Sequence, residues 1–111
     1  MMTQVNFDSI GGGGGALNPT LIEDKYVGAN ASTTCAIDKT KRYAAYCYLS
    51  YSDSSNFRSR FWYIDKGVID TEIAPQPTYM PATATINAAQ DTLTVTNEHG
   101  YGMWYALIQL D

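Results

Sequence analysis

The chain has 111 residues and a mass of 12.2 kDa, which is enough for one hydrophobic core and too little for two. Apolar residues make up 45% and charged residues 16%, so the chain can offset its conformational entropy by burial, and a disordered acidic tail is excluded. The net charge of −4 argues against a nucleic-acid partner bound through phosphate neutralisation. Nine tyrosines, beside two tryptophans and three phenylalanines, are the unusual feature of the composition.

The N-terminal residues contain no basic region followed by an apolar stretch, so no secretory signal peptide is expected. No window approaches the roughly 18 consecutive apolar residues of a membrane-spanning helix. We therefore expect a protein that is made in a cytoplasm and has no membrane partner.

Residues 1–16 are predicted to form a short apolar segment and a glycine tether, separate from a single β domain over residues 17–111. Val5–Ile10 is apolar, and Gly11–Gly15 lacks side chains that could pack. Such a short segment cannot form its own core. It must dock on its own domain, bind a partner or remain free, and we favour docking on a neighbouring subunit or another protein of the assembly.

From Leu17 onward the sequence is typical of β-strands, because stretches rich in Thr, Tyr, Val and Ile recur every 8 to 16 residues between turn signals. No stretch has a capped helical period. This pattern predicts an all-β fold, an antiparallel β-sandwich or small jelly roll of seven to eight strands. The candidate strands are Thr20–Val27, Ser32–Ile37, Arg42–Tyr51, Arg58–Ile64, Val68–Ala74, Ala82–Ala88, Asp91–Asn97 and Tyr101–Leu110.

Some of these strands alternate between apolar and polar residues, whereas others are apolar on both faces. In 91–97, Leu93 and Val95 are expected to point inward and the threonines outward, and Ala84, Ile86 and Ala88 are expected to behave like Leu93. In 42–51 and 101–110 both faces are apolar. A two-layer domain covers only one face of a strand, so the second face must meet a long loop, the N-terminal segment or another subunit, which we favour.

The two cysteines are expected to be free and half-buried. If Asp38–Lys41 is a hairpin loop, Cys35 lies opposite Ala44, and Cys47 is about 10 Å further along at roughly 3.3 Å per residue. A disulfide requires Cα atoms within about 7 Å.

The usual catalytic patterns are missing, so we expect no enzyme, no metal and no cofactor. His99 is the sole histidine, and its neighbour Glu98 lies in a predicted turn where adjacent side chains point apart. The sequence has no zinc or calcium motif, and Gly11–Gly15 lacks the Lys-Ser/Thr of a phosphate-binding loop. A hydrolase that uses two carboxylates brought together by the fold remains an alternative.

Five of the seven basic residues lie between positions 39 and 60, next to aromatic residues. Such interleaving suits stacking on bases or gripping anionic sugars. Because the net charge is negative, we favour a solvated hairpin whose arginines pair with Asp38, Asp53 and Asp65.

The aromatic residues suggest a contact surface. Tyr and Trp on an exposed strand face can stack under sugar rings, and the same residues are enriched in protein interfaces, which is the interpretation we favour. The ligand or interface candidates are Tyr46, Tyr48, Trp62, Tyr63, Trp104 and Tyr105.

The apolar segment and glycine run of residues 5–15, together with the closing strands Ala82–Ala88, Asp91–Asn97 and Tyr101–Leu110, resemble the small β-rich structural and fibre-tip proteins of tailed bacteriophages. The resemblance is one of style and contains no motif from which functional residues transfer. It implies a virion component, often a homotrimer, that binds a host surface or decorates a capsid or tail.

These observations together predict a non-enzymatic virion structural protein that acts in assembly or host-surface adhesion. Its expected partners are further copies of itself, with a trimer favoured, and other virion proteins bound through the N-terminal segment. The alternative is a carbohydrate-binding module with a surface Tyr/Trp platform for a surface glycan.

Overall fold

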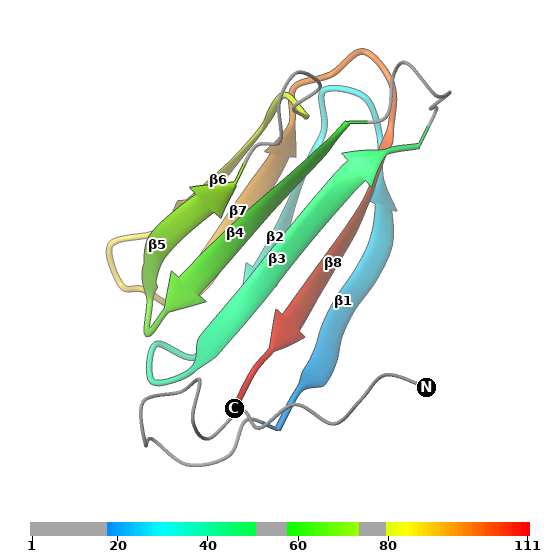
Figure 1. Cartoon of the computed structure of the whole chain (residues 1–111). Helices are drawn as coiled ribbons and strands as arrows, with labels where there is room; N and C mark the ends of the chain where they lie inside the picture. The colour runs from blue at the N-terminus through cyan, green and yellow to red at the C-terminus, as the bar shows by residue number, and fades with distance from the viewer. Residues whose placement is uncertain (1–17, 51–57, 74–79) are drawn as a thin grey trace, which may run out of the picture.

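The computed structural model describes residues 18–50, 58–73 and 80–111. In this part of the chain, eight antiparallel strands form two sheets packed as a sandwich, without a helix (Figure 1). The strands are β1 (Thr20–Val27), β2 (Ser32–Ala36), β3 (Arg42–Leu49), β4 (Ser59–Asp65), β5 (Val68–Ile73), β6 (Ala82–Ile86), β7 (Thr92–Asn97) and β8 (Met103–Gln109). The predicted fold class is therefore confirmed.

The five-stranded sheet has the order β1-β8-β3-β4-β5, and the three-stranded sheet has the order β2-β7-β6. Each predicted strand is present and agrees with the observed bounds to within two residues at either end, over the described residues. The predicted N-terminal segment and tether lie outside the described residues.

The core lies between the two sheets and is built from alternate residues of each strand. In β7, Leu93 and Val95 are buried as expected, and Ala84 and Ile86 of β6 pack against the same core. Ala88 is an exception, because β6 ends at Ile86 and Ala88 is exposed in the turn that follows. The buried apolar residues are Val27, Ile37, Tyr43, Ala45, Cys47, Leu49, Trp62, Ile64, Met80, Ala82, Leu93, Val95, Met103, Tyr105 and Leu107.

The link between β2 and β3 is not the predicted hairpin. It crosses from one sheet to the other, so Cys35 lies opposite Leu93 rather than opposite Ala44. Ile37 is buried at the end of β2 and Tyr43 at the start of β3, so the link carries the chain across the core from one apolar layer to the other. Local turn chemistry does not distinguish this crossing from a hairpin.

Both cysteines are free, as predicted. Cys35 is half-buried on the inner side of β2, whereas Cys47 is fully buried in β3. Burial raises the pKa of the Cys47 thiol to about 12, so this group is an inert part of the core at neutral pH.

The outward side of the three-stranded sheet, which we call the threonine face, is polar and uncharged. Cross-strand pairing sets its hydroxyl groups side by side, and Ser32 Oγ lies 2.8 Å from Thr96 Oγ1. The members of the threonine face are Ser32, Thr34, Ala36, Thr83, Thr85, Thr92, Thr94 and Thr96. Hydroxyl side chains can exchange hydrogen bonds with water, so this face is suited to solvent.

A buried asparagine at the end of β7 ties the two sheets together. The Asn97 side-chain amide donates to the carbonyl oxygens of Val27 (3.3 Å), Gly28 (3.1 Å) and Tyr101 (2.8 Å). Its side-chain oxygen accepts the His99 N–H at 2.9 Å. Asn97 is fully buried, and from β7 of the three-stranded sheet its side chain satisfies the Val27 carbonyl of β1 in the five-stranded sheet and backbone groups of the turns after β1 and before β8.

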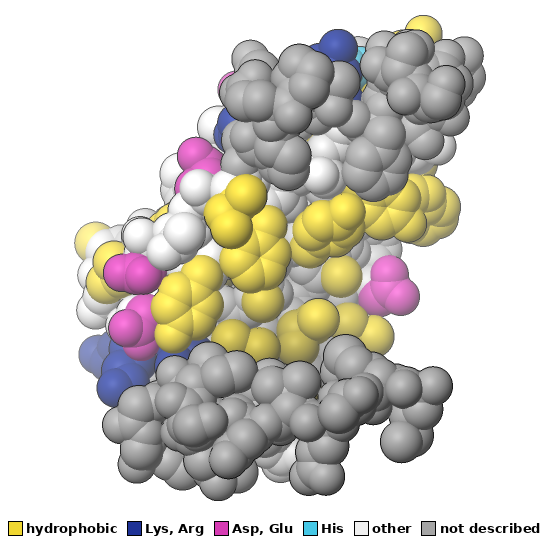
Figure 2. All heavy atoms as spheres, in the orientation of Figure 1, with side chains coloured by type: hydrophobic (Ala, Val, Ile, Leu, Met, Phe, Trp, Pro, Cys, Tyr) yellow, Lys and Arg dark blue, Asp and Glu magenta, His cyan; other side chains and the backbone are white. Residues whose placement is uncertain are grey.

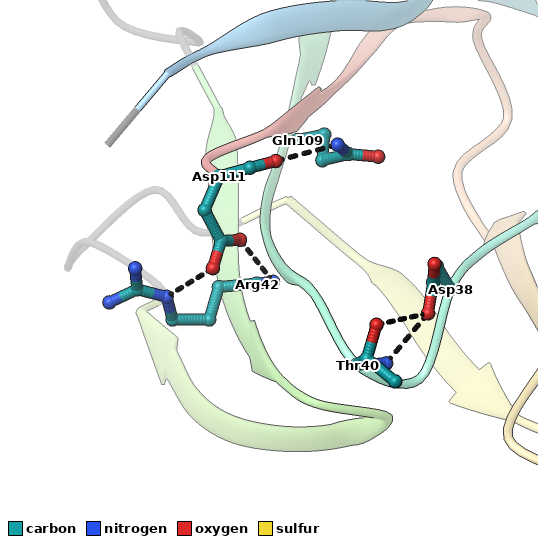
Figure 3. A network of polar contacts seen from close by, with 5 residues as sticks. All are labelled: Asp38, Thr40, Arg42, Gln109 and Asp111. Carbon is teal, nitrogen blue, oxygen red and sulfur yellow. Dashed lines mark hydrogen bonds and ion pairs between the residues drawn. The ribbon is translucent and has the colours of Figure 1, made fainter. Parts of the chain in front are cut away.

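A network of polar contacts lies at the end of the sandwich where β8 finishes (Figure 3). Asp111 accepts the Arg42 backbone N–H at 2.8 Å and pairs with Arg42 Nε at 3.1 Å. Asp38 Oδ1 accepts the Thr40 N–H at 2.8 Å and the Thr40 hydroxyl at 2.6 Å, which shapes the link between β2 and β3.

Candidate functional site

The outward side of the five-stranded sheet is apolar and aromatic, and we call it the aromatic face. Cross-strand pairing arranges its side chains in three rows that run across the strands. The rows are Tyr26–Trp104–Tyr48, Ala106–Tyr46–Phe61–Ile73 and Leu21–Ile108–Ala44–Tyr63. Figure 2 views this side of the molecule and shows the apolar side chains as a band across it.

Aromatic rings of this face are in contact in two pairs, one between neighbouring strands and one within β3. Tyr26 of β1 and Trp104 of β8 pack edge-on, with ring centroids 5.3 Å apart and an interplanar angle of 73°. Tyr46 and Tyr48 of β3 have ring centroids 5.7 Å apart. These contacts are of the kind that stabilise aromatic pairs. Because Trp104 lies opposite Tyr48 in the register of β8 and β3, the two pairs form a layer of adjacent rings.

This layer remains substantially exposed to solvent. Exposed fractions are 53% for Tyr26, 42% for Trp104, 37% for Tyr46, 50% for Ile73 and 58% for Leu21. With full side-chain areas of roughly 150–250 Å² for aromatic residues, such fractions leave on the order of 60–130 Å² per exposed ring. The whole face therefore reaches several hundred Å², which is the size of a functional patch rather than of scattered surface residues.

The aromatic face is almost free of charge. Asp24 is the one charged residue that pairs into its three rows, opposite Ala106 at the β1 end. Depletion of charge together with enrichment in Tyr, Trp and Phe characterises the central parts of protein interfaces.

Four of the six predicted site residues belong to the aromatic face, namely Tyr46, Tyr48, Tyr63 and Trp104. The other two, Trp62 and Tyr105, are 1% and 2% exposed and belong to the core. Adjacent residues of a strand point to opposite sides, so Trp62 and Tyr63 cannot share one surface. The Trp62 indole N–H bonds to Glu72 at the sheet edge, which satisfies its polar atom.

Tyr26 and Phe61 complete the face and were not among the predicted residues. In Phe61-Trp62-Tyr63 every residue is aromatic, so alternation alone does not show which one is outside. Tyr26 lies in the predicted strand Thr20–Val27, whose residues show no regular alternation of apolar and polar side chains that would indicate its outward face.

Gly102 provides the space in which the Tyr26 ring lies. A Cβ at Gly102 would be 1.9 Å from the Tyr26 hydroxyl oxygen and 2.1 Å from Cζ. A side chain at position 102 would therefore force the ring away from its place, and glycine is required by close approach rather than by backbone angle.

The basic residues between positions 39 and 60 do not form one surface. Arg42 pairs with Asp111, and Arg60 lies 3.6 Å from Glu72 and also donates to the Ala82 carbonyl. The ion-pair partners of Arg42 and Arg60 are thus Asp111 and Glu72, whereas the predicted partners were Asp38, Asp53 and Asp65, of which Asp53 is outside the described residues. Their aromatic neighbours Tyr43 and Trp62 are in the core.

His99 has a local structural role in its turn. Its Nδ1 accepts the Tyr101 N–H at 3.1 Å, and the two rings stack with centroids 5.6 Å apart. Burial and the positive charge of Arg58 lower the His99 pKa from its ordinary value. No resolved contact joins His99 to Glu98, so the structure supplies no evidence of an acid–base pair there.

Within residues 18–50, 58–73 and 80–111, no group of three His, Cys, Asp or Glu side chains is placed to hold a metal ion. The same residues include no helix long and apolar enough to cross a membrane. Comparison with known proteins found no matching family model, no matching curated protein and no matching solved structure. The aromatic face is the candidate site that the geometry provides.

Proposed function

We propose that this protein is a non-enzymatic structural protein of a virion and that its aromatic face is a contact surface between copies. The observation that carries the proposal is the set of three cross-strand apolar rows left exposed on a sheet whose other side already forms the core. Removing an apolar surface of this kind from water lowers the free energy of the system, so its burial against a partner is favourable.

The size and composition of the face support a protein partner. A standard interface buries roughly 800 Å² on each partner, and the several hundred Å² of the aromatic face are a substantial part of that area. Tyrosine and tryptophan are also the residues that most often dominate binding energy. An enzymatic function has no comparable support among the described residues.

The virion assignment and a trimeric state rest on the resemblance to phage structural proteins, which the β-sandwich fold accommodates. Host-surface adhesion and contacts through the N-terminal segment belong to the same proposal. Capsid or tail genes beside the coding gene would support the assignment, whereas an isolated housekeeping locus would count against it.

Sizing by light scattering and sedimentation tests the copy–copy contact. Tyr46 lies at the centre of the aromatic face, so Tyr46→Lys places like charges within the contact and is expected to weaken association by about 30-fold or more, which corresponds to a hot-spot loss near 2 kcal/mol. Thr94→Lys is the matched control, because it adds the same charge at the centre of the threonine face.

A wild-type protein that stays monomeric at high micromolar concentration would overturn this function. So would equal association of the Tyr46→Lys and Thr94→Lys proteins. Urea unfolding of the monomeric forms shows whether either lysine alters the fold itself.

The second candidate is a carbohydrate-binding module, favoured by the nearly uncharged row of exposed rings with tyrosine hydroxyls at their rims. Sugar rings present apolar faces that stack on such side chains. A glycan array with the wild type and Tyr48→Ala discriminates the two: saturable glycan binding by a monomer, lost in the variant, supports the module. Trp62→Ala is unsuitable for this test because Trp62 is in the core.

A further inference from the structure

The four edge strands of the sandwich differ in how they are protected against pairing with another strand. Both edges of the five-stranded sheet are interrupted. In β1 the register shifts between Leu21 and Glu23, and in β5 it shifts where Asp70 stands between the paired Ile69 and Thr71. Bulges and charged residues on an edge discourage an incoming strand, so these two edges are blocked.

In the three-stranded sheet, β6 has partial protection and β2 has none within the described residues. Pro81 directly precedes β6, and the Ala82 carbonyl accepts a bond from the Arg60 guanidinium. By contrast, β2 pairs with β7 in unbroken register and contains no proline and no charge. A regular, uncharged edge is a template for strand addition.

The backbone of β2 directs a full set of hydrogen-bonding groups at this edge. Ile37 donates to the Asp91 carbonyl, and Asn97 donates to the Ala31 carbonyl, so the residues at odd positions 31–37 point their backbone groups at β7. In an antiparallel ladder the alternate residues point the other way. Ser32, Thr34 and Ala36 therefore present their N–H and C=O groups to the open side, and all three residues are exposed.

We infer that β2 is a second contact edge, at which β2 of another copy adds antiparallel and joins two three-stranded sheets into one. A two-fold axis would pass at Thr34, so that Thr34 faces Thr34 of the other copy and Ser32 faces Ala36. Cys35 and Thr33 would then lie opposite each other on the core side.

The composition of β2 is suited to pairing with β2 of another copy. Two-fold pairing sets residues against themselves or their symmetry mates, and like charges directly opposite one another are destabilising. The sequence Ser-Thr-Thr-Cys-Ala contains no charge that could repel itself. Threonine pairs across strands are favourable, and the joined threonine faces would form one continuous hydroxyl surface.

A five-residue ladder gives modest affinity on its own, and an assembly already held by another contact raises its effective concentration. The inference rests on β2 alone and stands whether or not the aromatic face binds another copy. The two contacts lie on different sheets, so separate substitutions report on each.

The experiment uses the full chain carrying Tyr46→Lys, in which association through the aromatic face is weakened. We expect residual, concentration-dependent dimers of twice the 12.2 kDa mass, and a further loss of at least tenfold in association when Thr34→Lys is added. Thr94→Lys, one strand inward on the same face, is the matched control and should leave these dimers intact.

Amide hydrogen exchange gives an independent readout. The Ser32, Thr34 and Ala36 amides should exchange rapidly in dilute protein and become protected as concentration rises, and Thr34→Lys should remove that protection. The inference is overturned if Thr34→Lys and Thr94→Lys weaken the dimer equally. It is also overturned if these amides exchange equally slowly at every concentration, because the edge is then covered within one chain.

Discussion

The two outward faces of the sandwich are built from the same kind of strand and have opposite characters. The threonine face sets hydroxyl groups in register across three strands, whereas the aromatic face sets rings in register across five. Each threonine can exchange hydrogen bonds with water, so its face requires no cover. Burial of each exposed ring lowers the free energy, so the aromatic face favours binding to a partner.

The contrast shows that solvent exposure of side chains has different consequences on the threonine face and on the aromatic face. Exposed threonines are ordinary for an antiparallel sheet with one side in water. Exposed Tyr26, Tyr46 and Trp104 in adjacent rows are not, because they form one contiguous patch. The three predictions that follow test how the faces are held apart and how each one is organised.

The largest effect is expected where the two sheets are tied together. Asn97→Ala removes four hydrogen bonds, and the carbonyl oxygens of Val27, Gly28 and Tyr101 lose this donor in a buried or partly buried setting. We expect a loss of about 3 kcal/mol in the free energy of unfolding, measured by urea denaturation.

Asn87→Ala is the control for this substitution. Asn87 Oδ1 accepts the N–H groups of Asp91 and Thr92 at 3.0 Å, but in an exposed turn where water can replace them. Its loss should cost about 1 kcal/mol. Equal losses in the two variants would show that Asn97 does not act as a buried tie between the sheets.

An intermediate effect is expected from Gly102→Ala, which adds a methyl group where the Tyr26 ring lies. Displacing this ring breaks its edge-on contact with Trp104, so the near-ultraviolet circular dichroism should change and stability should fall by about 1 kcal/mol. Self-association should weaken less than in Tyr46→Lys.

Gly100→Ala serves as the comparison, because nothing lies within 4 Å of the added carbon at that position. A Gly102→Ala protein with an unchanged aromatic spectrum would contradict the packing described for Tyr26.

The smallest effect concerns pH. The folded chain holds the His99 pKa below its ordinary value, so the unfolded chain binds this proton more readily as the pH falls below about 6.5. The contribution of His99 to stability is therefore complete above that pH and declines below it, until the folded-state pKa has been passed. His99→Gln should reduce the fall in Tm between pH 8 and pH 5. An unchanged dependence of Tm on pH would contradict a role of His99 in the pH dependence of stability.

The sequence was sufficient to predict the strands and the sandwich. Threonine-rich alternation in 92–97 indicates which side chains are buried, because a hydroxyl and a leucine differ sharply in their cost of burial. The apolar character of both faces in β3 and β8 likewise follows from their residue order. Strand positions and the character of strand faces depend on the order of neighbouring residues, so they can be predicted from the sequence.

Sequence reasoning was insufficient wherever the answer depends on which layers meet. Whether the chain after Ile37 turns back or crosses to the other sheet depends on the partner of β2, which is β7 from much later in the chain. Whether Phe61 or Trp62 faces outward depends on the register of β4 against β3. Asn97 gave no signal, because its four partners come together only in the folded chain.

The pairing of β1 with β8 also sets an order of events during synthesis. Thr20 lies opposite Gln109, so the middle of the larger sheet closes only after nearly the whole domain has left the ribosome. The β3–β4 and β4–β5 pairs, by contrast, join neighbouring segments that are synthesised earlier, so they can form before β8 is made. The layer of rings that spans β1, β8 and β3 is therefore complete only when β8 has paired with both of its neighbours.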